Sequence, residues 1–176
     1  GEKPFSPLSM NPLSFLVRSV GPFTRTMEKL AKNDGVHFRG PYGRGFPTTA
    51  SQTPLVMVGG GTGAGPIMMA AEKCSVLRPE VFLGFSSHVD LRCVQTIDVD
   101  AINPHIAIDP PGKPGEVVRL LADVIDKRKK DFVNALVFLC GPVRMMEEVA
   151  KLFRPVTPSR NIHVARSAAS RCGATM

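Results

Sequence analysis

The chain has 176 residues, of which 43% are hydrophobic, and a formal net charge of +7 at pH 7. This length suits one domain, or one domain with a fragment of another, and no stretch approaches the roughly 20 apolar residues of a membrane span. The positive residues are scattered and the chain has one Tyr and no Trp, so we expect neither a nucleic-acid partner nor a membrane. No charged-then-apolar secretory pattern opens the sequence, which predicts a cytoplasmic protein.

Residues 1–50 differ in pattern from the rest of the chain. Two short strands and one helix are predicted here, over residues 15–20, 36–40 and 24–32. Thr24 is the candidate N-cap of that helix, since its side-chain oxygen can accept a backbone N–H. Residues 40–47, GPYGRGFP, are rich in glycine and bounded by prolines, which predicts a loop. Short strands with one short helix are typical of the edge of a β-barrel, so we expect a partial barrel.

From residue 54 onward, apolar runs alternate with helical patterns. The predicted strands cover residues 55–59, 80–87, 105–109, 135–141 and 161–166. The predicted helices cover residues 66–77, 89–92, 115–128 and 143–153. Near-continuous apolar strands alternating with helices predict an α/β fold, a parallel sheet with helices on both faces. Ligands of such sheets bind at the carboxyl ends of the strands.

A glycine-rich turn follows the first of these strands. Five glycines fall within residues 59–65, in the run VMVGGGTGAGPIMMAA. A strand, a glycine turn and a helix N-terminus in this order present free backbone N–H groups to a phosphate, and the Thr62 hydroxyl adds a donor. No Lys-Ser or Lys-Thr pair follows, so this is no Walker loop, and its consecutive glycines depart from the usual dinucleotide pattern. The alternative interpretation is a tight turn that needs positive φ angles.

The cysteines and histidines are dispersed along the sequence. No two cysteines have the spacing of a metal-binding pair, and we expect four separate reduced thiols, at Cys74, Cys93, Cys140 and Cys172. Since the four histidines are equally scattered, we expect no metal site.

Several motifs in this order resemble the ferredoxin–NADP reductase superfamily. GPYGRGFP precedes VGGGTGAGP, a later strand ends in LGF, and LCGP is followed by a pair of methionines. Within the superfamily, the chain is most similar to the electron-transfer subunits of dihydroorotate dehydrogenase and to the gamma subunits of NAD(P)-linked hydrogenases. The resemblance implies a partial FAD-binding β-barrel over residues 1–50 and an NAD(P)-binding α/β domain over residues 51–176.

The resemblance also assigns residues to the NAD(P) site. The positions that would receive the dinucleotide pyrophosphate are Gly60, Gly61, Thr62 and Gly63. The loop where the nicotinamide ring would meet the flavin contains Cys140, Gly141 and Pro142, with Cys140 in the catalytic position. A small, soft side chain there would let the two rings approach within about 3–3.5 Å. Met145 and Met146 follow, and we expect them to pack in the core.

Two N-terminal segments resemble the family's flavin-binding motifs. Lys3, Pro4, Phe5 and Ser6 are similar to an Arg-x-Tyr-Ser segment, which implies an aromatic side chain along the isoalloxazine ring and a serine that bonds to the flavin. Gly21 and Thr24 are similar to a Gly-x-x-Thr turn that meets the FAD phosphates. Lys3 lacks the bidentate fork of arginine, and Phe5 lacks the hydroxyl of tyrosine. The alternative is that these are ordinary surface or core residues.

The resemblance implies a flavoprotein oxidoreductase or its electron-transfer subunit. It would transfer hydride between NAD(P)H and FAD and exchange electrons with a dehydrogenase or hydrogenase type of partner subunit, or self-associate. The alternative is a redox-inactive nucleotide-binding or docking module. A complete FAD-binding barrel needs several strands before Lys3. Three alternatives follow: half of a flavin site holds the FAD, a partner brings the flavin, or the chain is a fragment.

Two further expectations concern the cluster and the coenzyme. The family's 2Fe–2S cluster needs four cysteine ligands, and only Cys172 resembles that motif, so we expect no cluster in this chain. After the strand ending in LGF, Ser86, Ser87 and Arg92 suit a 2′-phosphate and Asp90 suits a 2′-hydroxyl, which leaves NAD and NADP open.

Overall fold

The computed structural model describes residues 2–42, 45–47, 53–92 and 102–165. The N-terminal part contains β1 (Pro7–Met10), β2 (Leu13–Phe15) and α1 (Pro22–Glu28). The rest contains, in chain order, β3 (Leu55–Gly60), α2 (Ala64–Lys73), β4 (Glu80–Phe85), α3 (His88–Arg92), β5 (His105–Ile108), α4 (Glu116–Lys127), β6 (Leu136–Cys140), α5 (Val143–Phe153) and β7 (Ile162–Ala165).

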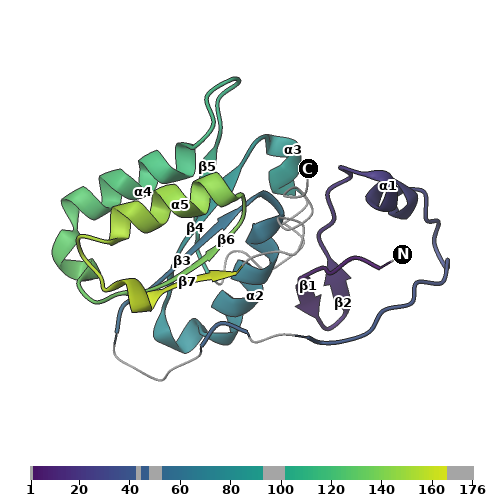
Figure 1. Ribbon diagram of the computed structural model, residues 1–176, viewed down its shortest axis with the longest axis horizontal. Helices are drawn as coiled ribbons and strands as arrows, with labels where there is room; N and C mark the ends of the chain where they lie inside the picture. Colours follow the sequence, from purple (N-terminus) through teal and green to yellow (C-terminus); the bar gives the residue numbers. More distant parts are fainter. Residues whose placement is uncertain (1, 43–44, 48–52, 93–101, 166–176) are drawn as a thin grey trace, which may run out of the picture.

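The later strands form one parallel sheet in the order β5-β4-β3-β6-β7. Its central strands are buried on both faces because their side chains alternate between two apolar clusters. Val56 and Val58 of β3 join the cluster beneath α4 and α5, whereas Leu55 and Met57 join the cluster beneath α2. The expected α/β fold, with helices on both faces of a parallel sheet, is confirmed (Figure 1).

Helical spacing explains how α4 and α5 cover the sheet. In α4 the buried residues Val117, Leu121 and Ile125 recur every four positions and so share one face. α5 buries its own stripe, which includes Val149 and Phe153. In α2 the buried residues are less confined to one face. Small residues such as Ala64 and Gly65 are buried in its first turn, which therefore packs closely against the surrounding elements.

Each strand and helix predicted after residue 54 is present, with shifted ends. The helix expected over 66–77 begins two residues earlier, and Ser75–Leu77 forms a separate 3₁₀ turn. The strand expected over 80–87 ends at Phe85, since α3 begins at His88. Helix 143–153 agrees at both ends.

The N-terminal part departs further from the expectation. β1 and β2 form a two-stranded antiparallel sheet, and of the strand predicted over 15–20 only Phe15 is paired. Residues 36–40 form no strand in the described structure, and Phe38 is 70% exposed. A short apolar run becomes a strand only where a neighbouring strand satisfies its backbone, and among the described residues neither 16–20 nor 36–40 has such a neighbour.

The predicted N-cap is also corrected. α1 begins at Pro22 with Gly21 as its N-cap, so Thr24 is the third residue of the helix. The Thr24 hydroxyl oxygen accepts hydrogen bonds from the N–H groups of Val20 and Gly21, at 3.0 and 3.1 Å. Proline suits the first helical turn because it needs no N–H partner there, which explains the earlier start.

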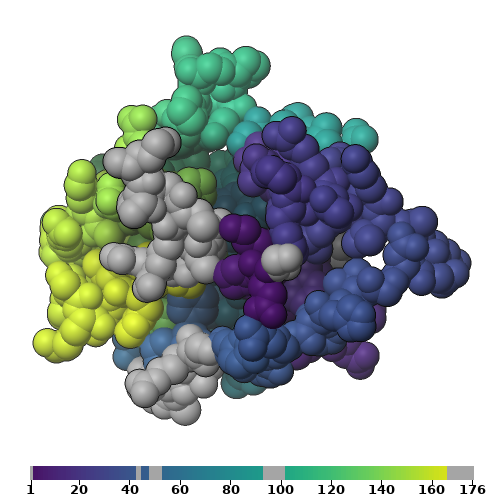
Figure 2. All heavy atoms as spheres, turned by 45° about the vertical axis from the view of Figure 1, so that its right-hand side comes forward, coloured from purple at the N-terminus to yellow at the C-terminus, as the bar shows by residue number. Residues whose placement is uncertain are grey.

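The N-terminal part lies against the α2 side of the sheet. The Leu8 side chain packs on Gly65 of α2, where an added Cβ would meet the Leu8 Cδ1 atom at 3.2 Å. Leu16 and Phe46 pack against the same apolar cluster as α2. Figure 2 shows the first residues of the chain, in dark purple, at the middle of one face of the molecule.

Candidate functional site

The direction in which the strands are added reverses between β3 and β6, and ligands of open parallel sheets bind at such a point. From β3 the chain proceeds to β4 and β5 on one side, whereas β6 and β7 lie on the other side (Figure 1). The helices that follow β3 and β6 leave toward opposite faces, which opens the sheet at their carboxyl ends. The register pairs Gly59 with Cys140, so the glycine turn and the Cys140–Pro142 loop lie side by side. The structure therefore brings the two predicted parts of the NAD(P) site together.

Two positions of the turn require glycine, each for a different reason. Gly61 has a φ of +54°, so the alternative interpretation, a turn that needs positive φ, holds at this residue. Gly60 and Gly63 have ordinary φ angles, of −127° and −69°. At Gly63 an added Cβ would lie 2.3 Å from the carbonyl oxygen of Cys140. Close approach of backbone therefore requires glycine at Gly63, whereas the atoms nearest to a Cβ on Gly60 belong to the side chains of Met145 and Pro142.

The turn leads directly into the N-terminus of α2. No side chain caps this helix, whose N-cap is Gly63. Among the loop and cap hydrogen bonds of the described residues, none is donated by the N–H of Gly61 or Thr62. Thr62 itself is exposed. Uncapped N–H groups at a helix N-terminus attract an anion, so the turn has the chemistry of a phosphate site.

Cys140 ends β6 on the α2 side of the sheet, in the same apolar cluster as Phe138. The residue is 3% exposed, and burial raises the pKa of its thiol to about 11. The thiol is therefore neutral near pH 7 and offers a small apolar contact rather than a nucleophile. Gly141 has a φ of +153°, and Pro142 follows as the N-cap of α5.

Met145 is half-buried and packs against the core cluster, as expected, and its side chain also reaches the two loops. Its sulfur would lie 2.5 Å from a Cβ atom added to Gly60. Its methyl carbon would lie 2.9 Å from a Cβ atom added to Gly141. Met146, by contrast, is buried in the core as expected. No local signal separates the two methionines, because Val143 and Arg144 on the same first turn of α5 are exposed.

The two predicted flavin segments also lie near each other. The Phe5 and Phe23 rings stack with centroids 6.3 Å apart, which joins residues 3–6 to the start of α1. The Thr24 hydroxyl, besides accepting two N–H groups, donates to the carbonyl oxygen of Gly21 at 3.1 Å. The hydrogen bonds of the Thr24 hydroxyl therefore hold the backbone of residues 20 and 21 at the start of α1. Phe5 and Phe23 are half-buried, and Pro4 and Ser6 are exposed.

Phe46 connects the glycine-rich segment before β3 to the sheet. Its ring lies parallel to that of Phe138, with centroids 4.5 Å apart and an interplanar angle of 7°. His163 of β7 meets the Phe138 ring edge-on, at 5.7 Å. Phe138 precedes Cys140 by two residues and points to the same face. The stack therefore fixes the N-terminal part directly beneath the Cys140 loop.

The residues considered for the ribose lie after β4. The Ser87 hydroxyl oxygen accepts the N–H of Asp90 at 3.2 Å, so Ser87 caps α3. Asp90 lies 4.0 Å from Arg18 of the N-terminal part. Ser86 and Arg92 are exposed.

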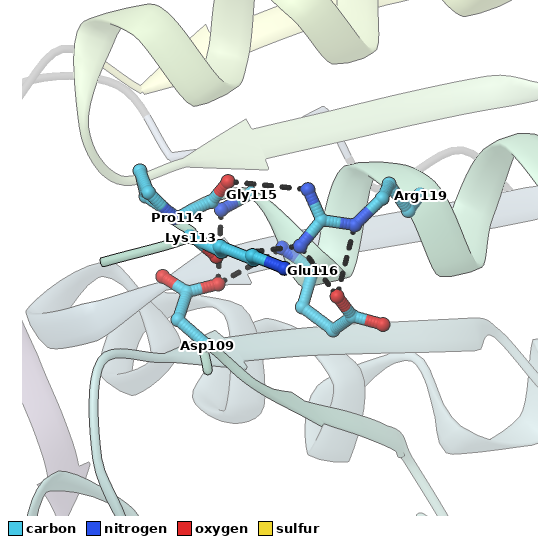
Figure 3. A network of polar contacts seen from close by, with 6 residues as sticks. All are labelled: Asp109, Lys113, Pro114, Gly115, Glu116 and Arg119. Atoms are coloured by element: carbon cyan, nitrogen blue, oxygen red, sulfur yellow. Dashed lines mark hydrogen bonds and ion pairs between the residues drawn. The ribbon is translucent and has the colours of Figure 1, made fainter. Parts of the chain in front are cut away.

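A polar network orders the loop after β5 (Figure 3). Asp109 Oδ1 accepts the N–H groups of Gly115 and Glu116, each at 2.9 Å, and so caps α4. Arg119 pairs with Glu116 and donates to the carbonyl oxygens of Lys113 and Pro114. Because Asp109 and Arg119 are engaged in this way, they form a scaffold for the loop at the carboxyl end of β5.

Two of the predicted free thiols, Cys74 and Cys140, lie buried in the structure, whereas Cys93 and Cys172 fall outside the described residues. Within the described ranges, His, Cys, Asp and Glu side chains form no group of three or more that could hold a metal ion. No helix in that part of the chain is long and apolar enough to cross a membrane.

No family model matches the chain, but individual relatives do. A probable dihydroorotate dehydrogenase B (NAD(+)) electron transfer subunit from Thermococcus kodakarensis is 30% identical over 179 residues, covering 98% of this chain and 70% of the relative. The Pyrococcus abyssi protein of that name is 31% identical over 151 residues, covering 86% of this chain and 58% of the relative. The chain thus spans little more than half of several relatives. Sulfhydrogenase 2 subunit gamma from Pyrococcus furiosus is 26% identical, with 98% of this chain covered.

Solved structures support the fold. The ferredoxin-NADP+ reductase from Plasmodium falciparum matches with a TM-score of 0.56 and 18% identity, covering 82% of this chain and 64% of that protein. A flavohemoglobin from Malassezia yamatoensis matches with a TM-score of 0.59 and 17% identity, covering 94% of this chain and 47% of that protein. At these identities the likeness establishes the shared architecture, which is that of the ferredoxin reductases.

Proposed function

Since this chain belongs to the family of dihydroorotate dehydrogenase B electron transfer subunits, we propose that it is the NAD(P)-binding part of a flavin-dependent oxidoreductase. It transfers hydride between NAD(P)H and FAD and passes electrons to or from a partner subunit. The proposed partner is of the dehydrogenase or hydrogenase type, in line with the names of the relatives.

The observation that carries this proposal is the contact between two glycine-containing loops at the carboxyl ends of β3 and β6. Gly63 lies against the backbone of Cys140, and Gly141 against the backbone of Gly60. The N–H of Ala64, the first residue of α2, donates to the carbonyl oxygens of Gly61 and Thr62. The N–H groups of Gly61 and Thr62 in the preceding turn are the donors left for a ligand, and a diphosphate is the group that such a cradle fits. The backbone N–H donors of the turn and its glycines, which have no side chains, both suit a dinucleotide.

Each loop has its own proposed role. The turn formed by Gly60, Gly61, Thr62 and Gly63 binds the pyrophosphate through N–H groups and the Thr62 hydroxyl. The Cys140–Pro142 loop positions the nicotinamide, and the neutral, compact Cys140 thiol leaves room beside it. The two cofactors supply the hydride chemistry when bound, while the protein contributes orientation and the exclusion of water. No acid or base on the chain is needed for that step.

We assign the flavin to the N-terminal part. Pro4, Phe5 and Ser6 offer a surface beside the ring system, and Gly21 and Thr24 shape the turn next to it. The Phe5–Phe23 stack supports this assignment because it joins the two segments. On this proposal residues 1–50 are part of an FAD-binding barrel, and residues 51–176 are the NAD(P) domain. The predicted lack of a 2Fe–2S cluster remains a prediction.

We also propose that the protein works in the cytoplasm. The buried free thiols of Cys74 and Cys140 agree with a reducing compartment.

Anaerobic titration tests the proposed function. Protein purified with its partner and supplied with FAD should show the flavin band in the visible region, and NADH or NADPH should bleach it. Protein that binds NADH but keeps no flavin in the complex would instead support the nucleotide-binding or docking module. Failure to bind either dinucleotide would overturn both assignments.

A further inference from the structure

We propose that Met145 is a positioning residue of the coenzyme site, which holds Gly60 and Gly141 at the spacing that the diphosphate requires. The inference rests on the proposed function. Met145 lies on the first turn of α5, directly after the Cys140–Pro142 loop. It acts on the coenzyme through the two glycines.

Neighbouring strands bring the two glycines together. Gly60 ends β3 and Gly141 follows the end of β6, and these strands pair side by side. A Cβ atom added to Gly141 would lie 3.0 Å from both the nitrogen and the oxygen of Gly60. The backbones of the two loops therefore touch, so a change in one displaces the other.

The Met145 thioether fills the space that both missing side chains leave. Along β3, Val56, Val58 and Gly60 point to the α5 side, because side chains alternate. On that side Met145 places its sulfur 2.5 Å, and its methyl carbon 3.1 Å, from the Cβ position of Gly60. The same methyl carbon lies 2.9 Å from the Cβ position of Gly141. One side chain thus supports both loops from below, while α2 and its amides lie on the other face.

Methionine is suited to this position. It is unbranched, has three rotatable bonds and fills irregular gaps. A shorter side chain would leave the two loops unsupported, and the mutual approach of Gly60 and Gly141 would then relax. A leucine of similar volume would keep most of the support.

Gly60 and Gly63 provide a matched pair of probes. Both have φ and ψ values that alanine adopts without strain. The nearest obstacle to a Cβ on Gly60 is the flexible end of Met145, at 2.5 Å, and the Cδ atom of Pro142 lies next, at 3.0 Å. The obstacle on Gly63 is the backbone of Cys140 and Gly141. Shortening Met145 should therefore relieve the first clash and leave the second unchanged.

The experiment is a double-mutant cycle on the full chain with its partner, read as the Kd for NADH and for ADP-ribose. We expect Met145→Ala and Gly60→Ala each to weaken binding by about tenfold, which equals about 1.4 kcal/mol. The Gly60→Ala/Met145→Ala variant should bind as well as Met145→Ala alone, or better, whereas Gly63→Ala/Met145→Ala should show no such recovery. Met145→Leu should bind nearly as the unmodified protein does.

Met146→Ala is the control, since Met146 lies on the same helix but in the core. Met146→Ala should lower the melting temperature. Combined with Gly60→Ala, it should not restore the binding that Gly60→Ala loses. The proposal would be overturned if the effects of Gly60→Ala and Met145→Ala on the free energy of NADH binding were additive. It would also be overturned if Met145→Ala bound NADH with the Kd of the unmodified protein. If Gly60→Ala does not fold, the readout is no longer Kd. It is whether the Gly60→Ala/Met145→Ala variant folds again. Unmodified protein that binds neither probe would contradict the proposed function instead.

Discussion

Gly63 and Cys140 are in direct backbone contact at the carboxyl ends of β3 and β6. A Cβ atom on residue 63 would lie 2.3 Å from the carbonyl oxygen of Cys140 and 2.5 Å from its carbonyl carbon. The turn assigned to the pyrophosphate and the loop assigned to the nicotinamide therefore touch through their backbones. This contact fixes one side of the proposed coenzyme site, and Met145 lies against Gly60 and Gly141 on the other side.

Gly63→Ala should weaken dinucleotide binding and lower stability together. The new methyl group cannot be accommodated by a rotamer change, because its nearest neighbours are backbone atoms. We expect a loss of about 1–3 kcal/mol in the free energy of unfolding, typical of overpacking. Urea unfolding and NADH titration measure the two effects. Gly35→Ala is the control, since nothing lies within 4 Å of a Cβ there, and it should be neutral in both assays.

Cys140 should resist alkylation at neutral pH. Burial raises the pKa of its thiol from 9.0 to about 11, so little thiolate exists below pH 9. The unfolded chain loses this proton at a lower pH than the folded protein does, so the contribution to stability is present below about pH 9 and is lost as the pH rises to about 11. Unfolding measured across this window should show a fall that Cys140→Ala lessens. A fast reaction of Cys140 with iodoacetamide at pH 7 would contradict the assignment.

Asp109 should stabilise the loop beside the site. One of its carboxylate oxygens accepts two backbone N–H groups at the start of α4. Asp109→Ala should lower the free energy of unfolding by about 0.5–2 kcal/mol, the usual cost of losing a helix cap. Asp109→Asn keeps an acceptor oxygen and should cost less. Equal stability of both variants and the unmodified protein in urea would show that the cap contributes nothing.

Phe46 should couple the N-terminal part to the sheet. Phe46→Ala removes the stack on Phe138, an interaction of about 0.5–1.5 kcal/mol beyond the burial of the ring. We expect lower stability and weaker flavin retention, whereas Phe46→Tyr should preserve both. Phe38→Ala is the control, because that ring is 70% exposed. Equal flavin retention in the Phe46→Ala and Phe38→Ala variants would argue against the coupling.

Local sequence alone was sufficient for the sheet and the glycine turn. Apolar runs such as residues 135–141 predicted strands buried on both faces, and the spacing of Val117, Leu121 and Ile125 predicted a helix with one apolar side. These patterns involve residues that are close together in the sequence, so they can be recognised before the tertiary structure is known. The N-terminal strands were predicted less well, because pairing of residues 15–20 and 36–40 depends on partners distant in sequence.

The tertiary structure decided which residues meet. Met145 was indistinguishable from Met146 in the sequence, and only the packing of α5 beneath the β3 and β6 loops shows that Met145 reaches both loops whereas Met146 lies in the core. The contact of Gly63 with Cys140 joins residues far apart in the chain, and it follows from the register of two strands. Local propensity determines the elements of this protein, while strand order and close packing determine its site, because the distances that matter there lie between segments.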